Sequence, residues 1–211
     1  MDPVRQNAIV LGGINYSDSS RVVWVLTPDY GRQSLMVKGG RRAGSKYLGR
    51  LETFSLVRVI YRKSGKGSLY TLREIDLEEP FAGIRTNLDA FWTASRAVEL
   101  VKAVSSEEQE SRDLFELLKG FLFLLGSGEL DDRWLKPLLA AFRWRLTSIL
   151  GMEPWLVECV RCGEKLTRAA NYMFLTAEGG VVCGECGGYA KSVQCVPEGG
   201  TSLSYGALRF I

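Results

Sequence analysis

The sequence predicts an α+β protein in which a small antiparallel β-barrel is followed by a helical bundle and by a four-cysteine metal module, either inserted or appended. Three observations support this prediction. Short β-branched and aromatic runs fill the first 80 residues, an apolar period near 3.6 begins at about residue 85, and two Cys-x2-Cys pairs follow later. We therefore expect a barrel over 1–80, a bundle over 81–155 and a metal module over 156–195.

Five runs of strand length predict the barrel. PDYG at 28–31 is a turn sequence between the second run and the third, and RKSGKG suits a hairpin connection between the last two. A five-stranded antiparallel barrel of this size is most often an OB-fold, which is the fold we expect. The runs are Ala8 to Leu11, Arg21 to Thr27, Gln33 to Lys38, Leu51 to Tyr61 and Ser68 to Ile75.

Three amphipathic segments predict the helical bundle. In NLDAFWTASRAVELVKAV, Asn87 is a plausible N-cap. A second helix is expected to begin at Ser105, which forms a capping box with Glu108, and to stop at Gly126. A third helix should cover KPLLAAFRWRLTSILG. The period changes at 78–86, and this stretch marks the expected domain boundary.

Charge is unevenly distributed along the chain, although the net charge is only +3. Residues 31–73 hold 11 basic side chains and one acidic one, whereas residues 74–158 hold 9 basic and 16 acidic. A net charge of +10 over one segment points to a polyanion as its partner. The chain has no histidine, which excludes Ser-His-Asp and Cys-His catalysis. With no apolar run of membrane-spanning length and no signal-peptide pattern, we expect a cytoplasmic protein.

The four paired cysteines predict a structural zinc site. Cys159-x2-Cys162 and Cys183-x2-Cys186 are separated by 20 residues, and a glycine follows three of these cysteines. Two such pairs supply the four vertices of a closed tetrahedron, which leaves no position for a catalytic water. Iron in a rubredoxin-like site and vestigial cysteines are the alternatives. The remaining cysteine, Cys195, is expected to be a free or buried thiol.

The stretch VKGGRRAGSK at 37–46 invites two interpretations. As a phosphate-binding loop it fails, because Ser45 and Lys46 stand in reversed order and a strand pattern follows where a helix should open. As a flexible basic loop for a nucleic acid strand it fits better, because lysine and arginine neutralise phosphates and aromatic rings stack on bases. A solvated loop with core tyrosines is the alternative. The candidate DNA-binding residues are Lys38, Arg41, Arg42, Lys46, Tyr47, Arg50, Arg58, Arg62, Lys63 and Lys66, with Tyr61 and Tyr70 interleaved.

Several motifs occur here in one order: LTPDYG, VKGGRRAGSKYLGRLETF, ILGMEPWLVECVRCG and GGVVCGECGG. In this order the chain resembles, over nearly its whole length, the RecO family of bacterial recombination mediators and DNA repair proteins. The resemblance implies an OB-fold, a helical bundle and a zinc module, and no turnover chemistry. It also implies binding of single- and double-stranded DNA, annealing of complementary strands, association with RecR and with the C-terminal tail of SSB, and help in loading RecA. A nucleoid-associated location is expected with it.

Residue by residue, the family's basic loop matches Lys38, Arg41, Arg42 and Lys46, and its metal ligands match Cys159, Cys162, Cys183 and Cys186. The resemblance places the SSB groove in the helical region without naming its residues. Family members usually continue into a further helical segment, so 196–211 is expected to be the start of it, with SYGALRFI as its first turns.

Two other functions are weighed against DNA annealing. One is a zinc-stabilised adaptor that acts through protein contacts on its acidic helical block, with the basic loop incidental. The other is a metal-dependent nuclease, which is weaker because the basic region contains only one carboxylate, Glu52.

Overall fold

The computed structural model describes residues 3–63, 69–167, 172–187 and 200–203 of the chain. The chain divides into two compact units, Met1–Leu146 and Thr147–Ile211. The first unit contains a barrel and most of the helical block, and the second contains the cysteine pairs. Among the described residues, no helix has the length and apolar character needed to cross a membrane.

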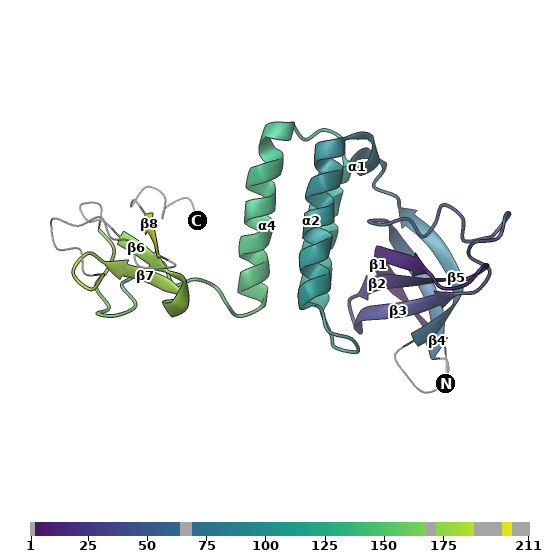
Figure 1. Ribbon diagram of the computed structural model, residues 1–211, viewed down its shortest axis with the longest axis horizontal. Helices are drawn as coiled ribbons and strands as arrows, with labels where there is room; N and C mark the ends of the chain where they lie inside the picture. The colour runs from purple at the N-terminus through teal and green to yellow at the C-terminus, as the bar shows by residue number, and fades with distance from the viewer. Residues whose placement is uncertain (1–2, 64–68, 168–171, 188–199, 204–211) are drawn as a thin grey trace. The chain divides into compact units, whose positions relative to one another are not determined.

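The first unit begins with a closed five-stranded barrel (Figure 1), as the sequence predicted. The order is β1-β2-β3-β5-β4. The barrel is not wholly antiparallel as expected, because β3 and β5, which close it, run parallel; the other pairs are antiparallel. The expected turn at 28–31 joins β2 to β3, where Thr27 Oγ1 donates a hydrogen bond to the carbonyl of Gly31 over 2.9 Å. The strands are β1 (Val4–Asn15), β2 (Arg21–Thr27), β3 (Gly31–Val37), β4 (Leu56–Lys63) and β5 (Leu69–Glu79).

Strand β4 starts five residues later than the sequence pattern suggested, at Leu56 and not at Leu51. The stretch between them is a turn that packs on β1: the amide of Phe54 donates to Val10 and the amide of Val10 donates to Ser55. Phe54 has a φ of 79°, which interrupts the extended backbone. Its ring is buried, so the apolar character that resembled a strand belongs to a packed turn.

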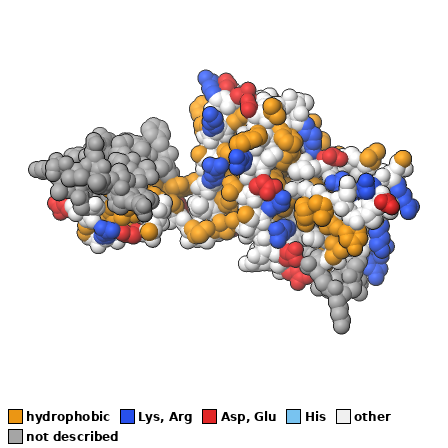
Figure 2. Space-filling view, viewed as in Figure 1, with side chains coloured by type: hydrophobic (Ala, Val, Ile, Leu, Met, Phe, Trp, Pro, Cys, Tyr) orange, Lys and Arg blue, Asp and Glu red, His pale blue; other side chains and the backbone are white. Residues whose placement is uncertain are grey.

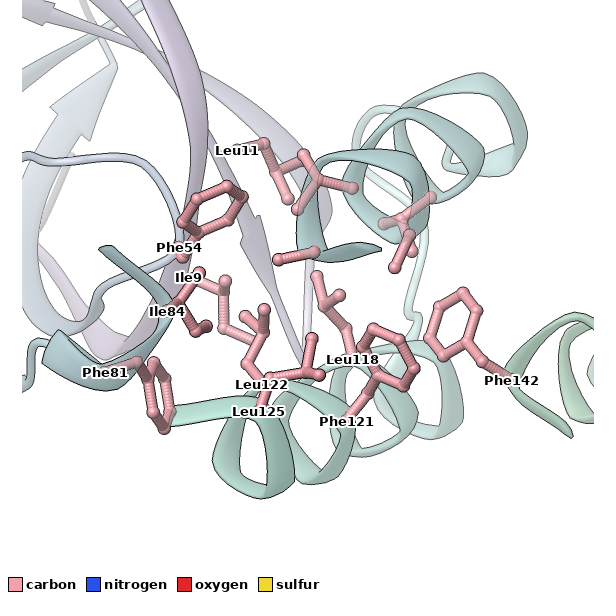
Figure 3. Packing of buried hydrophobic residues seen from close by; sticks show 14 of the residues in the cluster. Ile9, Leu11, Phe54, Phe81, Ile84, Leu118, Phe121, Leu122, Leu125 and Phe142 are labelled. Atoms are coloured by element: carbon pink, nitrogen blue, oxygen red, sulfur yellow. The ribbon is translucent and has the colours of Figure 1, made fainter. Parts of the chain in front are cut away.

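Strand β1 is apolar on both of its faces for a structural reason. Ala8 and Val10 point into the barrel core, whereas Ile9 and Leu11 belong to a second core shared with the helices (Figure 3). Because successive side chains of a strand point to opposite faces, a continuous apolar run is what a strand covered on both sides requires. The barrel and the helical block of the first unit therefore share one core.

Four helices form the helical block: α1 (Ala82–Thr86), α2 (Leu88–Val104), α3 (Arg112–Gly126) and α4 (Leu135–Ile149). Asn87 caps α2 as predicted, because its side chain accepts a hydrogen bond from the amide of Ala90 over 3.0 Å. Helix α3 also ends at Gly126 as predicted. The short helix α1 was not predicted. Phe81, with a φ of 48°, precedes it and is buried in the shared core (Figure 3).

The expected start of α3 at Ser105 is wrong. Ser105 is the C-cap of α2 and is buried, and α3 begins at Arg112. The stretch between the two helices packs on the barrel instead, where the amide of Arg32 donates to the carbonyl of Ser106 over 3.0 Å. A tertiary contact thus overrides the local capping pattern.

The second unit is built on a three-stranded antiparallel sheet in the order β7-β6-β8. The strands are β6 (Tyr172–Leu175), β7 (Gly180–Cys183) and β8 (Gly200–Leu203). Strand β8 corrects part of the sequence prediction, because 200–203 pair with β6 and are not helical. SYGALRFI and Cys195 lie outside the described residues.

Candidate nucleic-acid interface and metal centre

The basic stretch after β3 is a loop that is hydrogen-bonded to the barrel wall, which differs from the flexible connection expected from its glycines. On one side it contacts β5: Lys46 Nζ donates to the carbonyl of Arg73 over 3.0 Å, and Arg50 Nη1 donates to the carbonyl of Ile75 over 3.2 Å. The hydroxyl of Tyr47 also donates to the carbonyl of Arg73, over 3.3 Å. Three side chains of the loop are therefore bonded to two backbone carbonyls of one strand.

On its other side the loop is tied to the turn between β1 and β2. The guanidinium of Arg41 donates to the carbonyl of Ser17 over 2.7 Å, and the amide of Arg41 donates to the carbonyl of Ser19 over 3.1 Å. Gly39 has a φ of 73°, which favours glycine. At Gly40 a Cβ atom would come within 2.8 Å of a Val37 methyl group. The glycines therefore serve tight turning and close packing.

Tyr47 does not offer the stacking surface that the sequence suggested. Its side chain is 9% exposed and belongs to the barrel core, as does Tyr61, which is 1% exposed. Tyr70 is partly buried; its ring meets Tyr61 edge to face, with 5.2 Å between centroids, and its hydroxyl donates to Glu108 over 2.7 Å. For Tyr47 and Tyr61 the alternative interpretation, that these are core tyrosines, fits the structure better.

The predicted basic residues differ in what surrounds their charge. Arg58 forms an ion pair with Glu78 at 2.7 Å, so that its charge is largely compensated. Lys66 lies outside the described residues, and of Lys63 only the backbone is described. The others make no ion pair with any described residue, and bonds to neutral carbonyls leave a charge uncompensated. We call these six the basic set: Lys38, Arg41, Arg42, Lys46, Arg50 and Arg62.

All six side chains of the basic set are exposed. On the face shown in Figure 2, lysine and arginine side chains gather along the outer edge of the barrel. An exposed cluster of uncompensated positive charge attracts phosphate groups and releases their counterions. This part of the barrel can therefore hold a polyanion without a cofactor.

An open hollow of about 440 Å³ lies where the basic loop meets the β1–β2 turn. The sequence did not predict a contribution from this turn, because Tyr16 and the serines that follow it form no recognisable motif. Only the barrel topology, through the pairing of Arg21 with Val37, brings the turn beside Lys38. Its lining includes Tyr16, Ser17, Ser19, Ser20, Lys38 and Arg42.

The four paired cysteines meet in the second unit, as their spacing predicted. Their sulfur atoms all lie within 4.8 Å of one another. The two pairs have the same backbone turn: the amide of Gly163 donates to the carbonyl of Cys159 and that of Gly187 to the carbonyl of Cys183, both over 2.8 Å. Strand β7 carries Cys183 into the cluster, where it pairs in register with Tyr172.

This geometry fits a tetrahedral metal ion. Ligands at about 2.3 Å from a zinc ion stand roughly 3.8 Å apart, and Cys162 Sγ lies 3.7 Å from Cys183 Sγ. Backbone amides also point at the sulfurs: the amide of Cys183 donates to Cys159 Sγ over 3.3 Å, and that of Cys186 to Cys183 Sγ over 3.5 Å. Such bonds stabilise thiolates. The residues present therefore suit a four-sulfur metal site.

The acidities of the thiols agree with this fit. Burial disfavours the Cys159 thiolate, but hydrogen bonds from the amides of Cys183, Cys162 and Arg161 outweigh it and lower the pKa of Cys159 to about 6. Contacts with the Cys162 and Cys183 side chains raise the pKa of Cys186 to about 12. Cys159 thus ionises readily while Cys186 resists further negative charge. A bound cation relieves that repulsion, since metal ligation deprotonates thiols.

Arg161 joins the two cysteine pairs from outside the cluster. Its Nε donates to both carboxylate oxygens of Glu178, over 3.1 and 3.0 Å, and its Nη1 donates to the carbonyl of Cys186 over 2.5 Å. This hydrogen bond and the positive charge of Arg161 lower the pKa of the Glu178 carboxyl group. Arg161 lies in sequence between Cys159 and Cys162. Its hydrogen bond to the carbonyl of Cys186 therefore links the first cysteine pair to the second.

Comparisons with known proteins match both parts of the chain to one family. Residues 1–81 match the family model described as "Recombination protein O N terminal", and residues 85–211 match "Recombination protein O C terminal". The chain is 34% identical over 203 residues to a DNA repair protein RecO of Symbiobacterium thermophilum, covering 96% of this chain and 76% of that protein. It is 31% identical over 212 residues to a RecO protein of Desulfatibacillum aliphaticivorans, covering 99% and 78%.

Proposed function

The chain belongs to the RecO family of DNA repair proteins, and from this premise we propose that it binds single- and double-stranded DNA through the basic set and anneals complementary strands. The observation that carries the proposal is that the positive charges of the basic set are exposed and uncompensated. Six cations are exposed on one barrel without an acidic partner among the described residues. Of the 24 acidic residues of the chain, 16 lie in the segment 74–158, which includes the end of β5.

Annealing follows from the physics of such a surface. Two complementary strands repel each other through their phosphates, and lysine and arginine side chains reduce this repulsion while releasing counterions. Contacts to phosphates carry no sequence information, so that any two strands can be held. Because Tyr47 and Tyr61 are buried, they do not cover the base faces, and bases remain free to pair.

The metal site has a structural role in this proposal. Cys159, Cys162, Cys183 and Cys186 would hold Zn²⁺, and four sulfur ligands leave no open position for a substrate or a water. The ion supplies folding free energy to the second unit, whose described core is small. The proposal therefore includes no turnover chemistry.

We further propose that the protein works with RecR and SSB to assist the loading of RecA. The helical block offers a surface for a protein contact: Leu88, Phe91 and Trp92 of α2 are 81%, 43% and 56% exposed. Arg96 stacks over the Trp92 ring, with 4.2 Å from its Cζ to the ring centroid. An exposed apolar group with a cation beside it suits the C-terminal tail of SSB, and we place that contact here. The same surface supports the alternative, an adaptor without annealing activity.

One experiment separates these functions. Complementary strands coated with SSB are mixed with the purified chain, duplex formation is followed over time, and the zinc content of the same preparation is measured. We expect faster annealing and about one zinc ion per chain. A variant with Arg42 and Arg62 changed to glutamate should fold but lose annealing. If the variant anneals like the parent chain, the basic set does not carry the annealing. If the parent binds SSB and RecR but neither single- nor double-stranded DNA, the adaptor function is the right one.

A further inference from the structure

The hollow between the β1–β2 turn and the basic loop combines groups that suit one nucleotide. Tyr16 lines the hollow and is 66% exposed. Lys38 and Arg42 supply two exposed charges beside it, and three serines supply hydroxyl groups. A volume of about 440 Å³ is within the range of sites that hold small organic groups.

The turn that carries these groups is already ordered. The amides of Tyr16 and Ser17 both donate to the carbonyl of Ser20, over 3.0 and 3.2 Å, and the amide of Ser20 donates to Ser17 Oγ over 3.2 Å. Arg41 ties this turn to the basic loop through Ser17 and Ser19. The two sides of the hollow are therefore held at a fixed separation, and binding need not order them.

The charges and hydroxyl groups of the hollow are available. Within the described part of the chain, Lys38 and Arg42 form no ion pair, and the hydroxyls of Ser19 and Ser20 form no hydrogen bond. Asp18 is the acidic residue of the turn, and it does not line the hollow. The site thus offers positive charge and hydroxyl donors, which match a phosphate, next to an aromatic face, which matches a base.

We propose that this hollow is a subsite for one nucleotide of a single DNA strand, in which Tyr16 stacks on the base while Lys38 and Arg42 bind its phosphate. The inference rests on the proposed function and makes it more specific, because it assigns a base contact to a surface otherwise expected to touch phosphates only. Arg41 is a positioning residue that joins the two sides. The strand must be single, because in a duplex both faces of a base are covered by its neighbours.

The test compares two strands of equal length, an oligothymidylate and a strand whose nucleotides lack bases. Stacking on one aromatic side chain predicts that Tyr16→Ala weakens binding to oligothymidylate by roughly 5- to 150-fold. Binding to the abasic strand should change by less than about twofold. Tyr16→Phe and Tyr16→Trp should keep the affinity, because stacking needs the ring and not the hydroxyl. The combined change Lys38→Gln and Arg42→Gln should weaken binding to both strands.

Tyr30→Ala is the matched control. Tyr30 is 44% exposed and lies in the turn at the opposite end of β2, away from the hollow, so its removal should leave both affinities unchanged. Equal losses on both strands, or an equal loss on duplex DNA, would overturn the stacking contact. Unchanged binding of Tyr16→Ala to oligothymidylate would also overturn the stacking contact. In that case a steep salt dependence of binding by the parent chain would still support the proposed DNA binding. A parent chain that binds no strand would refute both.

Discussion

Whether or not a basic side chain is paired with an acidic residue predicts how much it contributes to the salt dependence of DNA affinity. For single strands the logarithm of the binding constant falls with the logarithm of salt concentration by about 0.7 per phosphate neutralised. When all six residues of the basic set contact phosphates, the slope is about −4, and affinity falls roughly 300-fold between 50 and 200 mM salt. Arg58 adds little to this slope because Glu78 already compensates it at 2.7 Å.

Two variants test this difference. Arg42→Gln removes one uncompensated charge and should make the slope shallower by about 0.7. The double change Arg58→Gln with Glu78→Gln removes an ion pair, keeps the net charge and should leave the slope unchanged. Fluorescence anisotropy of a labelled oligothymidylate, measured over a series of salt concentrations, gives both slopes. Equal slopes for the two variants, or a parent slope shallower than about −1, would refute the assignment of phosphate contacts to the basic set.

Three further predictions concern stability. Gly31→Ala should lower the free energy of unfolding in urea by about 2 kcal/mol or more. At this position φ is 62°, and the new Cβ would lie 2.5 Å from two backbone carbonyl oxygens. Gly44→Ala should cost less, because φ is 77° there but the space around the new Cβ is open. A zinc chelator should remove hydrogen-exchange protection from 155–167 and 172–186 and spare the barrel, and acid should do the same because protonated thiols release metal. Burial and the hydrogen bond to Glu108 raise the pKa of Tyr70 to about 12. The stability that this hydroxyl contributes below pH 10 should therefore be lost as the pH rises toward 12. Over this range the stability of Tyr70→Phe should fall less steeply.

The sequence predicted most of the barrel because its strands follow local rules. Thr27 to Gly31 forms the turn that its proline and glycine indicate, and the β-branched residues of β2 and β3 lie in strands. The run AIVL predicted a strand but not its surroundings. Ile9 and Leu11 pack on helices while Ala8 and Val10 fill the barrel, and only the assembled unit shows that both faces are covered.

The helical errors have a common cause in contacts between the barrel and the helices. Ser105 and Glu108 look like a capping box, but the stretch they occupy bonds to Arg32 on β3, and the helix begins only at Arg112. Likewise Phe81 adopts a φ of 48° because its ring enters the shared core before α1. A local pattern cannot reveal such a contact, since Arg32 stands 74 residues before Ser106 and Phe123, whose ring meets that of Phe81, stands 42 residues after Phe81.

The cysteine site was the easiest part to predict, because all four candidate ligands of the metal lie in two Cys-x2-Cys pairs. The nucleic-acid surface was harder. Its charges could be counted in the sequence, but whether a charge is compensated depends on a partner such as Glu78 on the next strand. Tyr16 and Lys38 are far apart in the sequence and share a hollow only because β1, β2 and β3 are neighbours.

The burial of two tyrosines bears directly on the proposed annealing. A barrel that stacked every base would bind single strands tightly but would hold the base faces away from a second strand. Here Tyr47 and Tyr61 belong to the core, and the hollow beside the basic loop presents one ring, that of Tyr16. One stacked base can fix the position of a strand along the basic set while its neighbours stay free to pair. The surface that VKGGRRAGSK helps to form is thus suited to holding a strand by its phosphates and releasing it into a duplex, since pairing would remove the one stacked base from Tyr16.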